Sequence, residues 1–212
     1  MALLIHFLGW YLYFPRFEIV EITPSNLLWA LLAIPLSYAI AFALLSAASA
    51  LTRIAMRYQR ATIQKSTICG IMLGLAGIEF PMLLCTGQVQ SFELMEAWSL
   101  MSCSALFALG LAKLFVTPLC ISLGWGGGPF FPVILGCLSI GYGIAAISGT
   151  DPIMLTAIFS AAILTSMTKQ PVLVVILMLF CFSLECLPFL IISALIFSKV
   201  PFPKARKTKS TA

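Results

Sequence analysis

Residues 122–136 read SLGWGGGPFFPVILG, and this stretch indicates how the surrounding chain folds. Four of its first seven residues are glycines, and Pro129-Phe130-Phe131-Pro132 then leads into an apolar run. Glycine lets a ligand approach the main chain closely, and proline is tolerated in the first turn of a helix. We therefore expect a glycine loop that opens into a helix start. Such a start attracts an anion, although the same residues would also form a plain loop between two membrane spans.

The composition is that of a membrane protein. Hydrophobic residues make up 61% of the 212 residues and charged residues only 9%, whereas about 25% of the residues in soluble domains are charged. Uncharged runs such as 26–52 and 114–150 exceed the roughly 20 residues that cross the hydrocarbon of a bilayer. The expected fold is therefore all-α, a multi-span membrane protein with long tilted, short and broken helices.

The net charge of +5 comes from two basic clusters and does not indicate a nucleic-acid partner. One cluster lies within residues 53–65 and the other within residues 199–209, and both border apolar segments. Basic residues beside membrane spans mark the cytoplasmic side. We expect an integral protein of the inner (plasma) membrane, with a transmembrane region over residues 1–203 and a basic cytoplasmic tail over residues 204–212.

Candidate catalytic and metal-binding residues are few. Seven cysteines are scattered through apolar segments without a CxxC pair, and His6 is the single histidine. No zinc set, catalytic triad or phosphate loop can be assembled, so neither a metal nor a cofactor is expected. Glu79 is either an acid with a role in permeation or an interfacial acid at a helix end beside Pro81, and Lys113 should face protein or a water-filled space.

Capping and turn signals predict where the long first helix lies. The sequence Thr23-Pro24-Ser25 suits a helix start because a hydroxyl can cap the first N–H groups. The helix from Ser25 should run to about Tyr58, which is long enough to require a tilt. Its stretch 39–50 is rich in Ala and Ser, which allow close packing against another helix.

Shorter or interrupted segments follow along the rest of the chain. They are a helix over 66–78 with Gly70, Gly74 and Gly77 spaced for helix packing, a surface segment with Glu93 and Glu96, helices over 99–117, 130–148 and 154–167, and an apolar run over 172–197 interrupted by Glu185 and Pro188. The turn at 149–152 predicts a helix start at its end. Short or broken apolar segments in a membrane protein usually surround a site.

These residues resemble the CLC family of chloride channels and chloride/proton antiporters. The similar segments are AKLFVT at 112–117, SLG at 122–124, GPFFP at 128–132, KQP at 169–171, LP at 187–188 and the long helix over 24–50. The segment GPFFP looks like the family's GxFxP element, in which main-chain amides at a helix start hold the central anion.

The resemblance implies that the chain corresponds to the second half of a CLC subunit. Its anion-binding residues would be Gly127, Gly128, Pro129, Phe130, Phe131, Pro132 and Phe202. Pro129 departs from the family because proline lacks the N–H that would face the anion. Phe202 departs because it keeps the ring of the family's tyrosine but not its hydroxyl. The first-half elements GSGIP and GREGP have no counterpart in this sequence.

The leading hypothesis is transport of chloride or another small anion, as a channel or an antiporter, by a truncated chain in a lipid bilayer. A homodimer or a first-half CLC chain would be its partner. The alternative is a non-transporting CLC remnant or a membrane interaction subunit, which the missing half, Pro129 and Phe202 favour. We do not expect an enzyme, because the chain offers no polar pairs at membrane depth.

Overall fold

The computed structural model is all-helical over the residues that it describes, which are 15–17, 20, 23–57, 62–84, 86–123 and 127–201. The helices are α2 (Pro24–Arg57), α3 (Thr62–Glu79), α4 (Gln88–Ala97), α5 (Cys103–Ser122), α6 (Phe130–Ser148), α7 (Pro152–Thr168), α8 (Pro171–Met178) and α9 (Leu187–Lys199). Short 3₁₀ turns are η1 (Pro81–Leu83), η2 (Trp98–Leu100) and η3 (Leu184–Cys186). Within the described part, α2, α5 and α6 are long and apolar enough to cross a membrane. The predicted all-α membrane fold is confirmed.

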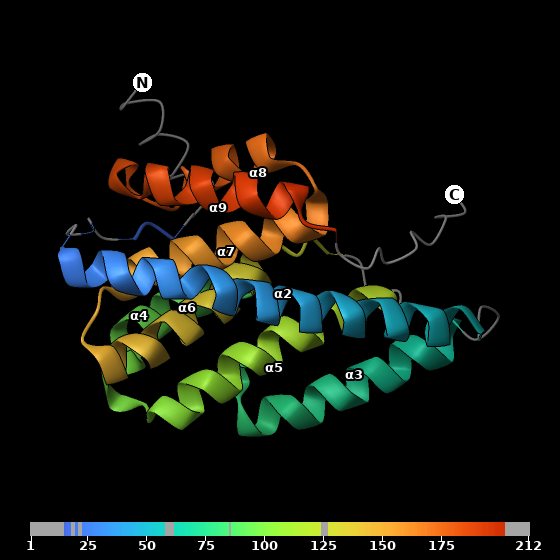
Figure 1. Cartoon of the computed structure of the whole chain (residues 1–212). Coiled ribbons are helices and arrows are strands. Elements are labelled where there is room, and N and C mark those ends of the chain that lie inside the picture. Colours follow the sequence, from blue (N-terminus) through green and yellow to red (C-terminus); the bar gives the residue numbers. More distant parts are fainter. Residues whose placement is uncertain are drawn as a thin grey trace.

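Helix α7 lies at the centre of the bundle. Figure 1 shows α5 and α3 on one side of it, beyond α6, and α8 and α9 on the other side, while α2 runs across α7 and α5. Every residue from Ile153 to Ser166 is buried. A helix that is apolar all round must be covered on all sides. This 17-residue helix is therefore a core element.

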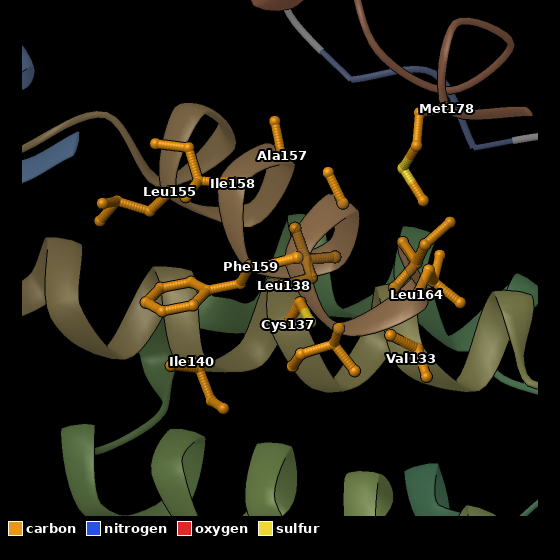
Figure 2. Close-up of a cluster of buried hydrophobic side chains, with 14 of the residues drawn as sticks. Val133, Cys137, Leu138, Ile140, Leu155, Ala157, Ile158, Phe159, Leu164 and Met178 are labelled. Carbon is orange, nitrogen blue, oxygen red and sulfur yellow. The ribbon is translucent and has the colours of Figure 1, made fainter. Parts of the chain in front are cut away.

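Apolar side chains between α6 and α7 form the middle of the core. Figure 2 shows this cluster, with Val133, Cys137 and Leu138 on α6 and Phe159 and Leu164 on α7. Lipid tails are as apolar as these side chains, so removal from water cannot hold two helices together inside a bilayer. Close packing and the dispersion attraction that it brings therefore hold this interface together.

Helices α5 and α6 approach most closely at two glycines. A Cβ on Gly110 would lie 2.7 Å from the carbonyl oxygen of Gly136, and one on Gly136 would lie 3.1 Å from the carbonyl oxygen of Gly110. Beside this contact, the hydroxyl of Ser139 donates a 2.6 Å hydrogen bond to the carbonyl of Leu106. Small residues with a polar side chain between them are the usual means of joining helices in a membrane.

The glycines of α3 pack less closely than their spacing predicts. Among the described residues, no atom lies within 4 Å of the place where a Cβ on Gly74 would stand, so no described helix packs on it. Gly77 contacts the side chain of Leu84 in the following turn. Helix α3 lies at the edge of the bundle (Figure 1). The spacing of small residues therefore identifies a face of α3 on which another helix could pack. At Gly74 no helix of the described chain packs there.

Helix α2 begins at Pro24, one residue before the predicted start. The hydroxyl of Thr23 accepts a 3.3 Å hydrogen bond from the N–H of Asn26, so Thr23 takes the capping role that was predicted for Ser25. Proline suits the first helical position because its fixed φ is already helical. The helix then continues to Arg57, close to its predicted end.

Helix α5 differs from the predicted range 99–117 at both ends. Ser102 caps its first turn, and the helix continues through Pro118. A proline inside a membrane helix is tolerated where side chains or neighbouring helices satisfy the backbone groups around it. Pro118 removes the N–H that would bond the carbonyl of Leu114. One residue earlier, the hydroxyl of Thr117 donates a 2.8 Å hydrogen bond to the carbonyl of Lys113. The predicted stop at Pro118 is therefore wrong.

The boundaries of the last helices agree with the sequence signals. Helix α6 spans the predicted range, and Gly149 ends it with a left-handed φ of 67°. The predicted interruption after α8 is present, with Glu185 exposed in η3 and Pro188 in the first turn of α9.

The Asp151 carboxylate caps α7, as the turn signal predicted, and its removal has a measurable cost. Oδ1 accepts hydrogen bonds from the N–H of Ile153 at 2.8 Å and of Met154 at 3.3 Å. Asp151→Ala is expected to lower the free energy of unfolding by about 1 kcal/mol. Asp151→Asn keeps an acceptor oxygen and should stay close to the parent chain. Unfolding by a denaturing detergent, followed by circular dichroism, measures both, and equal losses in the two variants would contradict the capping role.

Candidate anion site at the start of α6

The candidate site lies where the chain enters α6. Gly127 and Gly128 are exposed and not helical, in line with the predicted loop. Among the described residues other than the chain neighbours, no atom lies within 4 Å of a Cβ position on either glycine. The approach to the helix start is therefore open along these two residues. Residues 124–126, the rest of the predicted loop, lie outside the described residues.

The first turn of α6 brings the predicted main-chain donors together. Pro129 precedes the helix with φ −78° and ψ −5°, and its carbonyl accepts the N–H of Val133 at 3.0 Å. The amides of Phe130 and Phe131 come before that first helical bond, and amides in this position point out of the N-terminal end of a helix. Pro129 and Pro132 have no N–H. Of the residues in this turn, Phe130 and Phe131 therefore carry main-chain N–H groups, and the two prolines do not.

The helix behind this turn gives it a positive electrostatic character. Helix α6 has 19 residues and is buried from Val133 to Gly143. Its aligned peptide dipoles are equivalent to roughly half a positive charge at the N-terminal end. An anion at this end gains ~1 kcal/mol, up to ~2 kcal/mol in a partly buried setting. Such a gain favours an anion without trapping it.

A glycine from another segment supports the first turn of α6. Gly87 has a left-handed φ of 93° and precedes α4. A Cβ on it would lie 3.3 Å from the carbonyl oxygen of Phe131 and 3.1 Å from Cβ of Leu135. Both the backbone angle and the close approach require glycine. The turn between η1 and α4 thus rests directly against the candidate site.

Lys113 holds the segment that leads to Gly87. Its side chain is 2% exposed, and its ammonium donates to the carbonyl of Leu83 at 2.8 Å and to those of Met82 and Leu84 at 3.3 Å each. The prediction that Lys113 faces protein is confirmed. The lysine joins α5 to η1 and acts on the candidate site only through the backbone that it holds.

Lys169 has a similar role that the sequence prediction missed. It ends α7 with a left-handed φ of 58°. Its ammonium donates to the carbonyl of Val200 at 2.6 Å and to that of Phe197 at 3.2 Å, at the end of α9. Because these carbonyls belong to α9 and not to the helix that Lys169 ends, no signal in the local sequence indicated this role. Phe202, the remaining predicted site residue, lies outside the described residues.

The acidic residues do not join this site. Glu79 is exposed at the end of α3, and Glu93 and Glu96 are exposed on α4, as a surface segment should be. Among the described residues, no three His, Cys, Asp or Glu side chains gather as a metal site would require. A role for Glu79 in permeation stays a prediction.

The fold and the site define an integral membrane protein with several spans and a helix start that opens onto a glycine loop. The chain belongs to the voltage gated chloride channel family, and residues 2–200 match the sequence profile of that family. The predicted CLC membership is confirmed.

Two solved structures share this fold. A CLC-type fluoride/proton antiporter has a TM-score of 0.70 and 18% identity, over 88% of this chain and 47% of that chain. A slow cyanobacterial Cl⁻/H⁺ antiporter has a TM-score of 0.68 and 16% identity, over 88% of this chain and 45% of that chain. The chain thus spans about half the length of either structure. No curated protein sequence matches it.

Proposed function

We propose that this chain transports chloride or another small anion, with its ion held at the start of α6. Membership of the voltage gated chloride channel family supports the substrate class. The open glycine approach and the amides of Phe130 and Phe131 supply the chemistry, since main-chain dipoles can replace part of an anion's hydration shell. Binding by dipoles rather than by a fixed cation also lets the ion leave. The single observation that carries the proposal is the open helix start at Gly127 and Gly128.

We further propose that a first-half CLC segment completes the pathway, either on a partner chain or elsewhere in a longer polypeptide. The sequence corresponds to about half of each solved relative. An ion that enters a dry site must exchange its hydration shell for several hydrogen-bond donors, and each missing hydrogen bond costs a few kcal/mol. One helical turn, which lacks an N–H at Pro129, has too few donors to replace the hydration shell alone. A homodimer could combine two such pathways.

The orientation in the membrane is part of the same proposal. The basic clusters 53–65 and 199–209, which flank apolar helices, would lie on the cytoplasmic side of the inner (plasma) membrane, with residues 204–212 as a tail. Residues 202–212 lie outside the described part of the chain. Labelling of single cysteines placed in each cluster would test the orientation, and labels from opposite sides would overturn it.

Restoring the missing donor tests the site directly. Pro129→Leu adds an N–H at the helix start, and leucine adopts the φ of −78° and ψ of −5° there without strain. A hydrogen bond to a charged group is worth about 1.5–3 kcal/mol, so halide affinity should rise roughly tenfold or more. Calorimetric titration of the purified chain with chloride and with fluoride measures this change.

The matched variant acts in the opposite direction. Gly128→Leu places a side chain in open space, so it should leave the thermal stability unchanged while obstructing the approach to the amides. Halide binding should then fall. Unchanged binding in both variants would show that the anion binds elsewhere. Absence of halide binding in every form, with or without a first-half partner, would favour the non-transporting remnant or interaction subunit.

Flux measurements test the need for a partner. The chain alone in liposomes should give chloride efflux near background, since first-half ligands are missing. Co-expression with the first half of the CLC-type fluoride/proton antiporter should raise the efflux. Strong efflux from the chain alone that Gly128→Leu abolishes would contradict the need for a partner while supporting the site.

A further inference from the structure

Two cysteines from different helices meet between α3 and α5. The thiol of Cys69 donates to the sulfur of Cys120, with 3.5 Å between the Sγ atoms of residues that are 51 positions apart. Both are free thiols. Cys69 is 1% exposed, whereas Cys120 is half-buried. Cys69 is therefore enclosed, while the residue Cys120 is partly accessible.

The pair lies where α3 is attached to the bundle. Helix α3 presents large apolar side chains outward, including Ile68, Ile71 and Leu75, and contacts α5 and η1. One turn before Cys69, the hydroxyl of Ser66 donates to the carbonyl of Leu123 at 3.4 Å. A covalent link at Cys69 would thus reinforce the contact that holds this edge helix.

The local backbone can supply the movement that a bond needs. A disulfide has an S–S length of about 2.05 Å, so the sulfurs must approach by about 1.5 Å. Pro118 cannot donate a helical hydrogen bond, which loosens the turn directly before Cys120. Helix α3 is at the edge of the bundle (Figure 1) and can shift without disturbing α6 or α7.

We propose that Cys69 and Cys120 form an oxidisable dithiol site that a hydroperoxide converts into a disulfide. The thiol of Cys120, which is the more exposed, loses its proton, and the thiolate attacks the peroxide O–O bond. Cys120 becomes a sulfenic acid, and the other peroxide oxygen takes up the proton and leaves as water. The thiol of Cys69 then attacks that sulfur, forming the S–S bond and releasing a second water. Two thiols are oxidised, and one peroxide is reduced to two waters.

The consequence is mechanical and does not depend on the proposed anion function. The bond fastens α3 to the last turn of α5, the turn that leads into the glycine loop. The N–H of Leu123 donates a 3.0 Å hydrogen bond to the carbonyl of Leu119 at the end of this turn. The backbone hydrogen bonds of residues 119–123 should then open less often. Amide hydrogen exchange over these residues should slow in the oxidised chain.

Peptide mapping of the purified full chain in detergent tests the proposal. After treatment with hydrogen peroxide and alkylation of the remaining thiols, a cross-linked peptide containing Cys69 and Cys120 should appear and should vanish on reduction with dithiothreitol. The cross-link should be absent from C69S and from C120S. Cys103 is another half-buried free cysteine on α5, so C103S is the matched control and should keep the cross-link.

Several results would overturn the proposal. They are oxidation of Cys120 to a sulfinic acid while Cys69 stays a free thiol, pairing of either residue with a different cysteine, and a complete lack of reaction at both. Because the wild-type chain gives these results by itself, loss of folding in a serine variant does not prevent the test. Equal amide exchange before and after cross-linking would overturn the mechanical consequence.

Discussion

Gly110→Ala is expected to disrupt the packing of α5 on α6 and to lower the free energy of unfolding strongly. The new Cβ would lie 2.7 Å from both the Gly136 carbonyl oxygen and Cγ1 of Ile140, and 3.2 Å from the Ile140 amide nitrogen. Two of these three atoms are backbone inside a helix, so they cannot turn away. Overpacking costs 1–3 kcal/mol where side chains can adjust, and we expect at least ~3 kcal/mol here.

Gly74→Ala is the matched control for that substitution. Gly74 is also a glycine inside an apolar helix, yet no atom stands within 4 Å of its Cβ position. Alanine replaces glycine in a helix with a gain of roughly 0.5–1 kcal/mol when nothing clashes. The midpoint of detergent-induced unfolding should therefore fall sharply for Gly110→Ala and stay level or rise for Gly74→Ala. Similar midpoints for the two variants would contradict the close contact between α5 and α6.

Lys113→Met is the second change with a large expected effect. The substitution removes the donor shared by the carbonyls of Met82, Leu83 and Leu84. Methionine avoids the cost of burying an ammonium group, but the backbone carbonyls cannot be removed with it. Leaving a buried acceptor unsatisfied costs about 1–3 kcal/mol. We therefore expect the free energy of unfolding to fall by about 3 kcal/mol for the three carbonyls together.

Lys199→Met is the control, because Lys199 is exposed at the end of α9 and its loss should leave the unfolding midpoint unchanged. The Lys113 variant should also release the segment before Gly87, which rests against Phe131. Amide exchange at residues 82–87 should therefore be faster in Lys113→Met than in Lys199→Met. Equal exchange and equal midpoints would show that the lysine does not hold η1 in place.

The helix start that forms the candidate site could be predicted from the sequence because its signals act within a few residues. The Gly-Pro-Phe-Phe-Pro stretch identified the start of α6, and the structure begins that helix at Phe130. The contacts that hold the first turn of α6 in place could not be predicted from the sequence. They come from Gly87, whose left-handed backbone lies against Phe131, and from Lys113, whose three carbonyl bonds hold the segment before Gly87.

The sequence by itself determined the class of protein and most helix boundaries. Long uncharged runs require helices in a membrane, since each backbone polar group must be satisfied within its own segment. Caps such as Asp151 act within one turn, so they can be recognised without knowledge of the fold. The tertiary structure decided which glycines meet, that α5 continues through Pro118, and that Cys69 lies beside Cys120. Each of these depends on the close approach of helices distant in sequence, which no local pattern specifies.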